Sequence, residues 1–486
     1  MGRRKKFWRT TLIMYGLAAF LAGLGLARLK TIAPSGLVIC IVFFVAITAR
    51  KKSYLTLVSI VFCGLVFGWW RGSVYMLKLQ PYQDLKNRAV IMIGVADTDA
   101  VYGDKSQLSF DVSNLQITDP VQMHLVGKVS VKGFGVPMVY KGDKVQLEGR
   151  LYLTRGSKQA GISFAQIAVL EPDHSRVQSI KRQFEAGMQS ALPEPLASFS
   201  LGLLIGQRST LPESVTNQLS AVGLTHVVAV SGYNLTIIVL AVSQVLKKRS
   251  KYQNMVCSLL LIGLFLLFTG LSASIVRAAL VSVLGLVSWY YGRQIRPLLL
   301  ILLAAAFTAG WYPLYAWTDI GWYLSFLAFY GVLIVAPLVT KRWYKDKKPS
   351  FVTLLVIETM AAQIMTVPLI MYIFGQYSVV ALLANILVVP LVPLAMLLTL
   401  VAGMGGMLVP QIAGWLALPA RLLLTYMLDI VALFSRIPFA VAHPHINASA
   451  MVSLYGVVIF LTMVLWFKTR SKNAIITDTN EKARGV

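Results

Sequence analysis

The sequence is poor in cysteine and in charged residues. Only 3 of its 486 residues are cysteine and 13% are charged, whereas 57% are hydrophobic. Soluble domains carry charge on about a quarter of their residues, so a soluble globular protein is excluded. The cysteines are Cys40, Cys63 and Cys257. All three fall within long apolar runs, which leaves no disulfide framework and no cysteine-based zinc site.

Enzyme signatures are missing as well. The sequence contains no HExxH motif and no phosphate-binding P-loop. Its histidines are His124, His174, His226, His443 and His445. They are too scattered to form a metal site. His226 and Ser231 would lie roughly on one side of a helix, so a membrane hydrolase stays as a weaker alternative, although no carboxylate orients the pair. We therefore expect no metal, no cofactor and no enzymatic activity.

Long apolar runs are abundant. A run of about 18–22 residues can cross a hydrocarbon core of ~30 Å as a helix. Twelve spans are predicted, at residues 11–29, 32–49, 54–71, 226–246, 253–270, 273–291, 297–312, 320–340, 351–372, 378–400, 412–434 and 449–467. The first is longer than the apolar core of a signal peptide and leads into further spans, so we interpret it as a retained helix. The predicted fold class is a polytopic α-helical membrane protein.

Basic residues outnumber acidic ones by 45 to 19, a net charge of +26. Clusters of Lys and Arg precede the first span and follow the second, fourth, sixth, eighth and twelfth. Arg28, Lys30 and Arg436 are the exceptions. Cytoplasmic loops of membrane proteins carry such an excess. The pattern predicts a cytoplasmic-membrane protein in the lipid bilayer with both termini inside, and the charge alone does not indicate nucleic-acid binding.

Between the third and fourth spans, apolar and polar residues alternate in place of the continuous apolar runs. Five strands are predicted there, at residues 89–97, 107–117, 123–132, 143–153 and 162–169. Five short strands suit a small Greek-key barrel of the OB type, inserted on the outer side. Its aromatic residues could stack on single-stranded nucleic acid or simply pack the core, and residues 83–173 are electrically neutral, with ten basic and ten acidic residues.

Residues 175–192 follow the barrel with apolar side chains at helical spacing among basic ones, which predicts an amphipathic helix on the membrane surface. The next apolar stretch, 196–206, is too short to span. With 213–222 it is expected to form interfacial or re-entrant helices. The predicted division is therefore 1–72 (three transmembrane helices), 83–173 (β-domain), 174–222 (interfacial helices), 223–467 (transmembrane domain) and 468–486 (cytoplasmic tail).

Polar residues at membrane depth are costly and often mark a pathway. Near His226, the residues Ser231, Gly232 and Asn234 interrupt the fourth span. They favour either a broken helix facing a wet cavity or close helix–helix packing, and both interpretations stay open. Arg277 in the sixth span lies at a depth where its guanidinium could meet a phosphate or pair with a carboxylate, and both interpretations stay open.

The other polar groups of the spans are Glu358, Gln363, Asn385, Arg421 and Asp429. They suggest an intramembrane polar or ion-pair network, in which Arg277 and Glu358 could pair. Pro390 and Pro393 are expected to break the tenth span.

Four segments together resemble the ComEC family of competence proteins. They are GLLIGQRSTLPESVTNQLSAVGLTHVVAVSGYNLTII (202–238), SASIVRAAL (272–280), DIGWYLSFLAFYGVLI (319–334) and FGQYSVVALLANILVVPLVPL (374–394). The order of these motifs, the three N-terminal spans and the outer barrel all fit the family. The resemblance implies a channel that passes single-stranded DNA into the cytoplasm during transformation, with 223–467 as the channel domain. A solute transporter of the same architecture is the alternative.

The resemblance also implies a DNA pathway near His226, Ser231, Gly232, Asn234, Arg277 and Asn385. This chain departs from the family pattern at Gln207, Asn234 and Tyr323, where an acidic residue, a second histidine and a glutamine are usual. The loss of that histidine weakens any proton or metal chemistry there. The expected form is a short one without the C-terminal metallo-β-lactamase-like domain. A DNA receptor, a cytoplasmic helicase or ATPase, and a separate nuclease are the implied partners.

Overall fold

The computed structural model describes most of the chain. The described residues are 9–32, 54–102, 107–133, 139–154, 156, 158–207, 210–228, 235, 239, 250–270, 273–292, 296–345, 347 and 349–483. Two predicted spans, 32–49 and 226–246, fall almost wholly outside them, as do Ser231, Gly232 and Asn234.

The described elements are mostly helices. The longer helices are α1 (Arg9–Leu29), α3 (Tyr54–Asp84), α4 (Arg176–Ala191), α5 (Leu196–Ile205), α6 (Glu213–Val222), α9 (Lys251–Thr269), α10 (Ala273–Tyr290), α11 (Pro297–Trp311), α13 (Ile320–Tyr330), α14 (Ala336–Tyr344), α15 (Phe351–Phe374), α16 (Ala381–Val388), α17 (Val392–Leu408), α19 (Leu418–Ser435) and α20 (Ala448–Ala483). Short helices are α7 (Thr225–Val228), α12 (Leu314–Thr318) and α18 (Ala413–Leu416).

Within this described part, eight helices are long and apolar enough to cross a membrane. Two shorter apolar helices, Ser274–Tyr290 and Pro297–Trp311, stand at two further predicted positions. The neighbouring helices are expected to bury part of the surface of these two short helices. Twelve spans are therefore not confirmed as a count, but each predicted span that lies inside the described ranges coincides with a helix.

The first helix pair packs through glycine. Gly64, Gly68 and Gly72 recur every fourth residue on α3 and form one face, against which α1 lies. A Cβ at Gly68 would overlap the backbone carbonyl of Phe20, so only glycine lets the two backbones meet. Small residues at this spacing are typical of close helix contacts in membranes.

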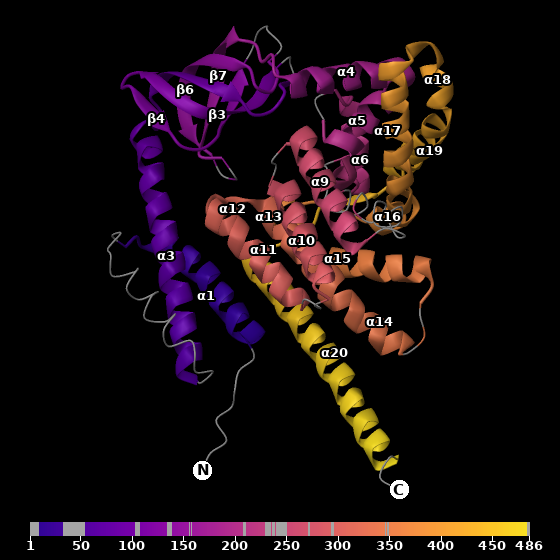
Figure 1. Ribbon diagram of the computed structural model, residues 1–486. Helices are drawn as coiled ribbons and strands as arrows, with labels where there is room; N and C mark the ends of the chain where they lie inside the picture. Colours follow the sequence, from indigo (N-terminus) through magenta and orange to yellow (C-terminus); the bar gives the residue numbers. More distant parts are fainter. Residues whose placement is uncertain are drawn as a thin grey trace.

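Helix α3 is longer than the predicted span. Its 31 residues give a length of ~46 Å at 1.5 Å per residue, well beyond the ~30 Å of a hydrocarbon core. The sequence predicted an end near residue 71, but the helix continues to Asp84. Its last turns carry the β-domain, which lies beyond the end of α3 (Figure 1).

The β-domain is a closed barrel. Its strands are β1 (Ala89–Ala96), β2 (Val101–Tyr102), β3 (Leu108–Asp119), β4 (Met123–Leu125), β5 (Val129–Gly133), β6 (Lys144–Leu153) and β7 (Ala160–Glu171). The order β1-β6-β7-β5-β3 closes because β3 also pairs with β1. All pairs in this ring are antiparallel except β5 with β7. Alternate residues such as Met92, Val112 and Leu147 fill the core.

The predicted strands are confirmed within a few residues, with one difference. The strand expected at 123–132 is split into β4 and β5. The residues between them, Val126 to Lys128, include Gly127 at a φ of 131°, a backbone conformation that only glycine adopts readily. The interruption forms a turn that faces the membrane helices.

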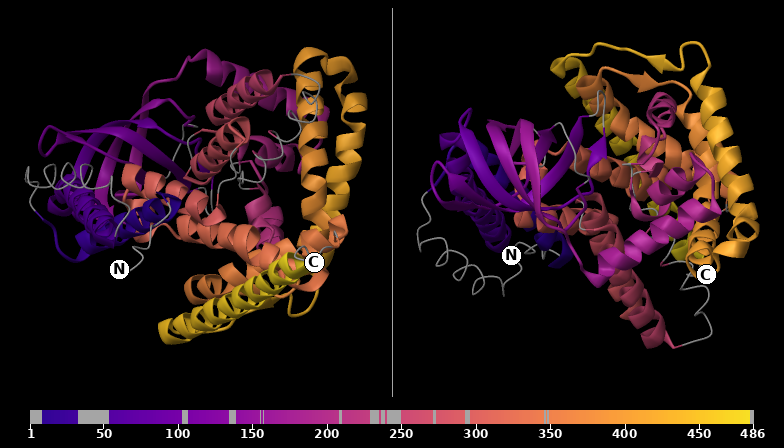
Figure 2. Two further views of the ribbon diagram at one scale, coloured as in Figure 1. Left: turned by 60° about the horizontal axis from the view of Figure 1, so that its bottom comes forward. Right: turned by 90° about the horizontal axis from the view of Figure 1, so that it is seen from above.

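Helix α4 joins the barrel to the last helices (Figure 1). Ser175 caps its first turn by accepting a hydrogen bond from the Gln178 backbone N–H. The amphipathic helix predicted at 175–192 is thus confirmed. Its apolar face packs on α17, where Gly187 and Gly406 touch. Seen from above, the barrel and the α17–α19 group lie on opposite sides of the molecule (Figure 2).

Helix α5 is buried by protein on all sides. Every residue from Leu196 to Leu204 is buried, and the helix packs on α4, α17 and α19. Its short length therefore fits a helix enclosed by its neighbours rather than one lying at the membrane interface, which was one of the two predicted locations.

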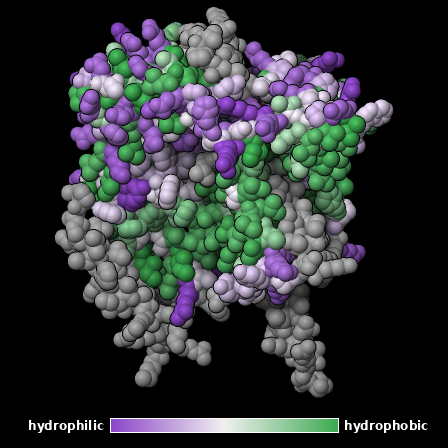
Figure 3. Space-filling model, turned by 45° about the horizontal axis from the view of Figure 1, so that its top comes forward, coloured by the Kyte–Doolittle hydropathy of each residue, from purple (hydrophilic) through white to green (hydrophobic). Residues whose placement is uncertain are grey.

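The predicted break in the tenth span is confirmed. Helix α16 ends at Val388, a 3₁₀ turn covers Val389–Leu391, and α17 begins at Val392. Pro390 and Pro393 lack the N–H groups that a continuous helix requires. A two-stranded ribbon of β8 (Tyr377–Ser378) and β9 (Val441–Ala442) precedes α16. Hydrophobic side chains cover the helices, whereas hydrophilic ones gather over the barrel and α4 (Figure 3).

Candidate functional site

Arg277 is a buried cation with incomplete hydrogen bonding. It lies in the second turn of α10 and is 2% exposed. Its Nη2 donates to the backbone oxygen of Gly321 at 3.1 Å, and the guanidinium carbon lies 5.8 Å from the ring centre of Phe326. Nε and Nη1 are buried and meet no acceptor among the described residues. An uncompensated buried charge costs several kcal/mol, so this arrangement calls for an anion or for water.

The ionisable groups that act on Arg277 come from α12 and from the residue that joins it to α13. Asp319 and Tyr315 interact with its charge electrostatically, but within the described ranges no carboxylate comes within ion-pair distance of it. Asp319 instead caps α13 by accepting from the backbone N–H of Trp322 at 3.2 Å. The guanidinium is therefore only partly neutralised.

The suggested pair between Arg277 and Glu358 does not form. Helix α10 packs on α9, α11 and α13, whereas Glu358 belongs to α15, which packs on α13, α14, α16 and α20. Glu358 is half-buried, and no ion pair joins it to Arg277 among the described residues. Which helices pack together is not revealed by a sequence alone.

His226 and Asn385 lie in a second polar region. His226 Nδ1 lies 3.1 Å from the backbone oxygen of Gly223, and its ring is exposed. Gly223 packs against Ser378 and Ala381, and Asn385 lies one turn beyond Ala381 on α16. Both Ser378 Oγ and Asn385 Oδ1 are buried without a partner in the described part of the chain.

These two regions are separate. Helix α16 packs on α15 and α19, not on the helices that surround Arg277. The structure thus brings His226 and Asn385 near each other but does not place Arg277 with them. Sequence reasoning missed Ser378. The sequence feature that could have marked Ser378 is its hydroxyl group at the start of an apolar run.

The other four polar positions do not form an ion-pair network. Glu358 and Gln363 are half-buried on α15, whereas Arg421 and Asp429 are exposed on α19. No ion pair joins any of them within the described ranges. The four side chains lie on two different helices, α15 and α19, so the prediction of a common network is corrected.

The barrel is fixed to the membrane helices by a buried amide. Gln159, 5% exposed, donates through Nε2 to Tyr75 Oη at 2.8 Å and also to the hydroxyl of Tyr312. Its Oε1 accepts from the backbone N–H of Lys128 at 2.6 Å. One side chain therefore ties the β4–β5 turn and β7 to α3 and to the end of α11.

A second connection joins the barrel to α4. Lys181 Nζ lies 2.8 Å from Asp99 Oδ2 and 3.6 Å from Glu185 Oε1, with all three side chains largely buried. Burial raises the pKa of the Glu185 carboxyl above its ordinary value, against the opposing influences of Lys181 and a hydrogen bond from Gln207. No group of three metal-ligating side chains occurs in the described part.

These features define a helical membrane protein that carries a small β-barrel domain above polar sites between its helices. A family model described as "Competence protein" matches residues 203–469. Because the match covers more than half of the chain, the chain belongs to this competence protein family, and the predicted resemblance is confirmed.

One similar protein is the ComE operon protein 3 of Bacillus subtilis (strain 168). It is 24% identical over 237 residues, which make up 48% of this chain and 30% of that protein. The chain thus spans less than a third of the relative that it matches. No solved structure matches the chain.

Proposed function

We propose that this protein is a channel through which single-stranded DNA crosses the cytoplasmic membrane during natural transformation. The observation that carries the proposal is Arg277, whose guanidinium is buried with two nitrogens lacking partners among the described residues. Arginine binds phosphate well because its planar N–H groups match the phosphate oxygens. A strand passing the outer ends of α10 and α13 would complete these hydrogen bonds one phosphate at a time.

The orientation of the helices supports both termini inside. The first turn of α1 and the last turn of α20 point away from the barrel (Figure 1). Lys251 begins α9, Arg296 precedes α11, and Lys341 and Arg342 end α14. All of these belong to the ends expected at the cytoplasmic surface by the positive-inside rule. The barrel then stands outside, where incoming DNA arrives.

The barrel supports an external DNA-binding role. Its closed ring of β1, β3, β5, β7 and β6 suits an OB-type barrel, a class that often holds single strands. The proposal assigns no catalytic step to this chain. A DNA receptor, a cytoplasmic helicase or ATPase, and a separate nuclease would deliver, pull and degrade the strands.

The test is deletion of the gene followed by transformation with duplex DNA labelled on each strand separately. We expect surface-bound DNA to persist and nuclease-protected label in the cytoplasm to disappear, with recovery when the gene is restored. Wild-type amounts of internalised label in the deletion strain would exclude the channel. Normal DNA uptake together with loss of a small-solute flux would instead favour the solute transporter.

A further inference from the structure

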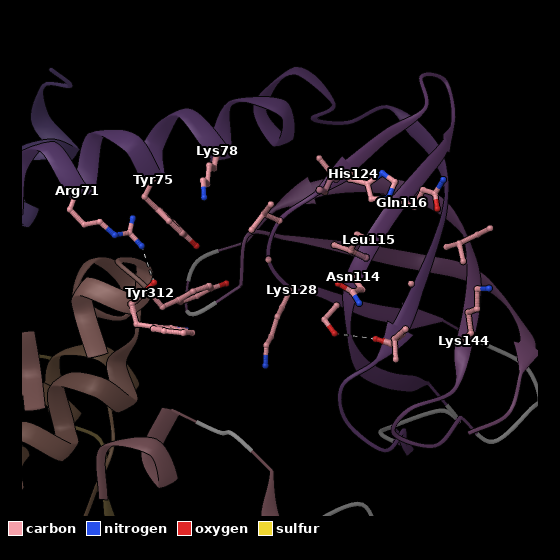
Figure 4. Close-up of a pocket in the computed structure, with 18 residues that line it drawn as sticks. Arg71, Tyr75, Lys78, Asn114, Leu115, Gln116, His124, Lys128, Lys144 and Tyr312 are labelled. Carbon is pink, nitrogen blue, oxygen red and sulfur yellow. Dashed lines mark hydrogen bonds between the residues drawn. The ribbon is translucent and has the colours of Figure 1, made fainter. Parts of the chain in front are cut away.

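A cavity lies where the barrel meets the membrane helices. It has a volume of about 740 Å³ and is lined by α3, by residues of β1, β3, β4 and β6, by the β4–β5 turn, by Trp311 at the end of α11 and by Tyr312 after it. In Figure 4, Arg71 and Lys78 on α3 face Lys128 of the barrel across this space. Its size is that of a pocket for a drug-sized ligand, which suits a short stretch of one strand.

All the charged residues that line the cavity are basic. Its basic residues are Arg71, Lys78, Lys128 and Lys144, with His124 beside them, and no Asp or Glu is among the lining residues. The barrel itself has equal numbers of basic and acidic residues. The positive lining is thus a local asymmetry and not a consequence of the charge of the whole domain.

The four cations differ in how they are neutralised. Lys128 pairs with Asp97, and Lys144 pairs with Glu171 at 3.4 Å. Arg71 and Lys78 have no carboxylate partner within the described ranges. Lys78 is exposed, so its charge is open to a ligand.

The spacing of Arg71 and Lys78, the two cations without a carboxylate partner in the described part of the chain, fits a polymer. Arg71 and Lys78 are two helical turns apart on one face of α3, which places their backbones ~10 Å apart along the axis. A lipid headgroup presents its phosphate at one height of the membrane surface. A strand with a phosphate on every nucleotide meets both cations at once, so the geometry favours the polymer.

An aromatic surface adjoins the cations. The Trp311 side chain is 76% exposed, and its backbone oxygen accepts a hydrogen bond from Arg71 Nη2 at 3.0 Å. Stacking on such a ring holds bases without regard to their sequence. The ring of Tyr312 in the cavity wall lies 5.0 Å, centre to centre, from the ring of Tyr315, and Tyr315 interacts electrostatically with Arg277.

We propose that this cavity is a binding site for single-stranded nucleic acid at the outer entrance. Lys78 and Arg71 contact successive parts of the phosphate backbone, and Trp311 stacks on a base. The inference rests on the proposed function, because it supplies the entry site for the strand that Arg277 would receive.

The test uses the full chain in nanodiscs of zwitterionic lipid and a fluorescent oligothymidylate, with binding followed by anisotropy across a salt series. Each phosphate contact of a single strand contributes ~0.7 to the slope of log K against log salt. Lys78→Gln should therefore make the slope shallower by about 0.7 and weaken binding about fivefold at 0.1 M salt. Trp311→Ala should weaken binding roughly tenfold with the slope unchanged.

Matched controls are available on the same protein. Lys132→Gln removes an exposed lysine of the barrel, and Trp343→Ala removes a tryptophan that is 70% exposed; neither residue lines the cavity. Equal effects of Lys78→Gln and Lys132→Gln would overturn the proposal, as would absence of oligonucleotide binding by the wild type. Binding of anionic-lipid vesicles that alone depends on Lys78 would assign the cavity to lipid. Each of these failures leaves the deletion result untouched, so the two proposals fail separately.

Discussion

Arg277 shows at the scale of one side chain why the site suits an anion. A guanidinium carries five N–H groups and no acceptor, yet one nitrogen of Arg277 has a defined partner, the Gly321 carbonyl. Phe326 contributes a cation–π contact, worth about 0.5–2 kcal/mol. These interactions do not offset the burial of a charge. The residue is therefore costly for folding and available to a phosphate.

Replacing Arg277 by methionine separates folding from function. Arg277→Met keeps a flexible unbranched side chain and removes the charge, so the thermal unfolding midpoint should stay the same or rise. DNA uptake should fall at least about tenfold, because a charge-assisted hydrogen bond contributes ~1.5–3 kcal/mol. Arg421→Met, at an exposed arginine of α19, should leave uptake unchanged. A fall in stability with unchanged uptake would identify Arg277 as structural.

Candidate site residues were predictable from the sequence where a polar side chain interrupts an apolar run. Arg277 and Asn385 stand out as polar groups in apolar runs, and the structure finds both buried with an unpartnered polar atom. Gln159 does not stand out, because its significance comes from partners far away in the sequence, such as Tyr75. Neither periodicity nor composition contains that information.

At the scale of elements, glycine residues determine how closely α4 packs on α17. A Cβ at Gly406 would overlap the backbone carbonyl of Gly187, and one at Gly403 would lie 2.6 Å from the Phe184 ring. The two helices thus cross in backbone contact. This crossing holds the far end of α4, while Lys181 and Asp99 hold its first half to the barrel.

Gly406→Ala should push α4 and α17 apart at this crossing. The added methyl group meets backbone atoms that cannot rotate away, so we expect the protein to be destabilised by about 1–3 kcal/mol and α4 to become more sensitive to protease. Gly456→Ala is the matched control, since a Cβ at Gly456 meets nothing within 4 Å. There alanine should be neutral or slightly stabilising. Equal stability of the two variants would contradict the close crossing.

Glu185 should make stability depend on pH. Since burial raises its pKa in the folded state, the folded protein keeps the proton at pH values where the unfolded chain has released it. This contribution is fully present below pH ~4.3 and is lost as pH rises through the folded pKa.

The variant Glu185→Gln removes that dependence. Its thermal midpoint in detergent should match the wild type in acid and exceed it near neutral pH. Glu171→Gln, at an exposed carboxylate of β7 (72%), should follow the wild type at every pH. A constant difference between Glu185→Gln and the wild type across the pH range would show that the carboxyl does not titrate as inferred.

Elements were the most predictable scale. Apolar run length and alternation gave the helices and strands within a few residues, because both depend on local sequence. The exceptions have tertiary causes. Helix α3 extends to Asp84 because the barrel packs on its last turns through Tyr82, and Gly127 splits the third strand where the turn meets Gln159.

At the scale of the molecule, the barrel is fixed over one end of the helices. Gln159 joins it to α3 and α11, Lys181 joins it to α4, and Lys141 Nζ lies against Gly270 after α9. Loop charge predicted the orientation of the spans, but the sequence could not give which helices pack together. Whether Arg277 pairs with Glu358 therefore stayed open from the sequence, and no ion pair joins them among the described residues.

The central claim is that an incoming strand passes the outer ends of α10 and α13 beside Arg277. A photo-crosslinking aromatic amino acid at Tyr315, which lies beside Arg277, tests it during uptake of labelled DNA. Tyr426, an exposed tyrosine of α19 (42%), is the control position. The account predicts DNA crosslinks from position 315 and none from 426. Normal uptake with no crosslink at 315, or with equal crosslinks at both positions, would contradict it.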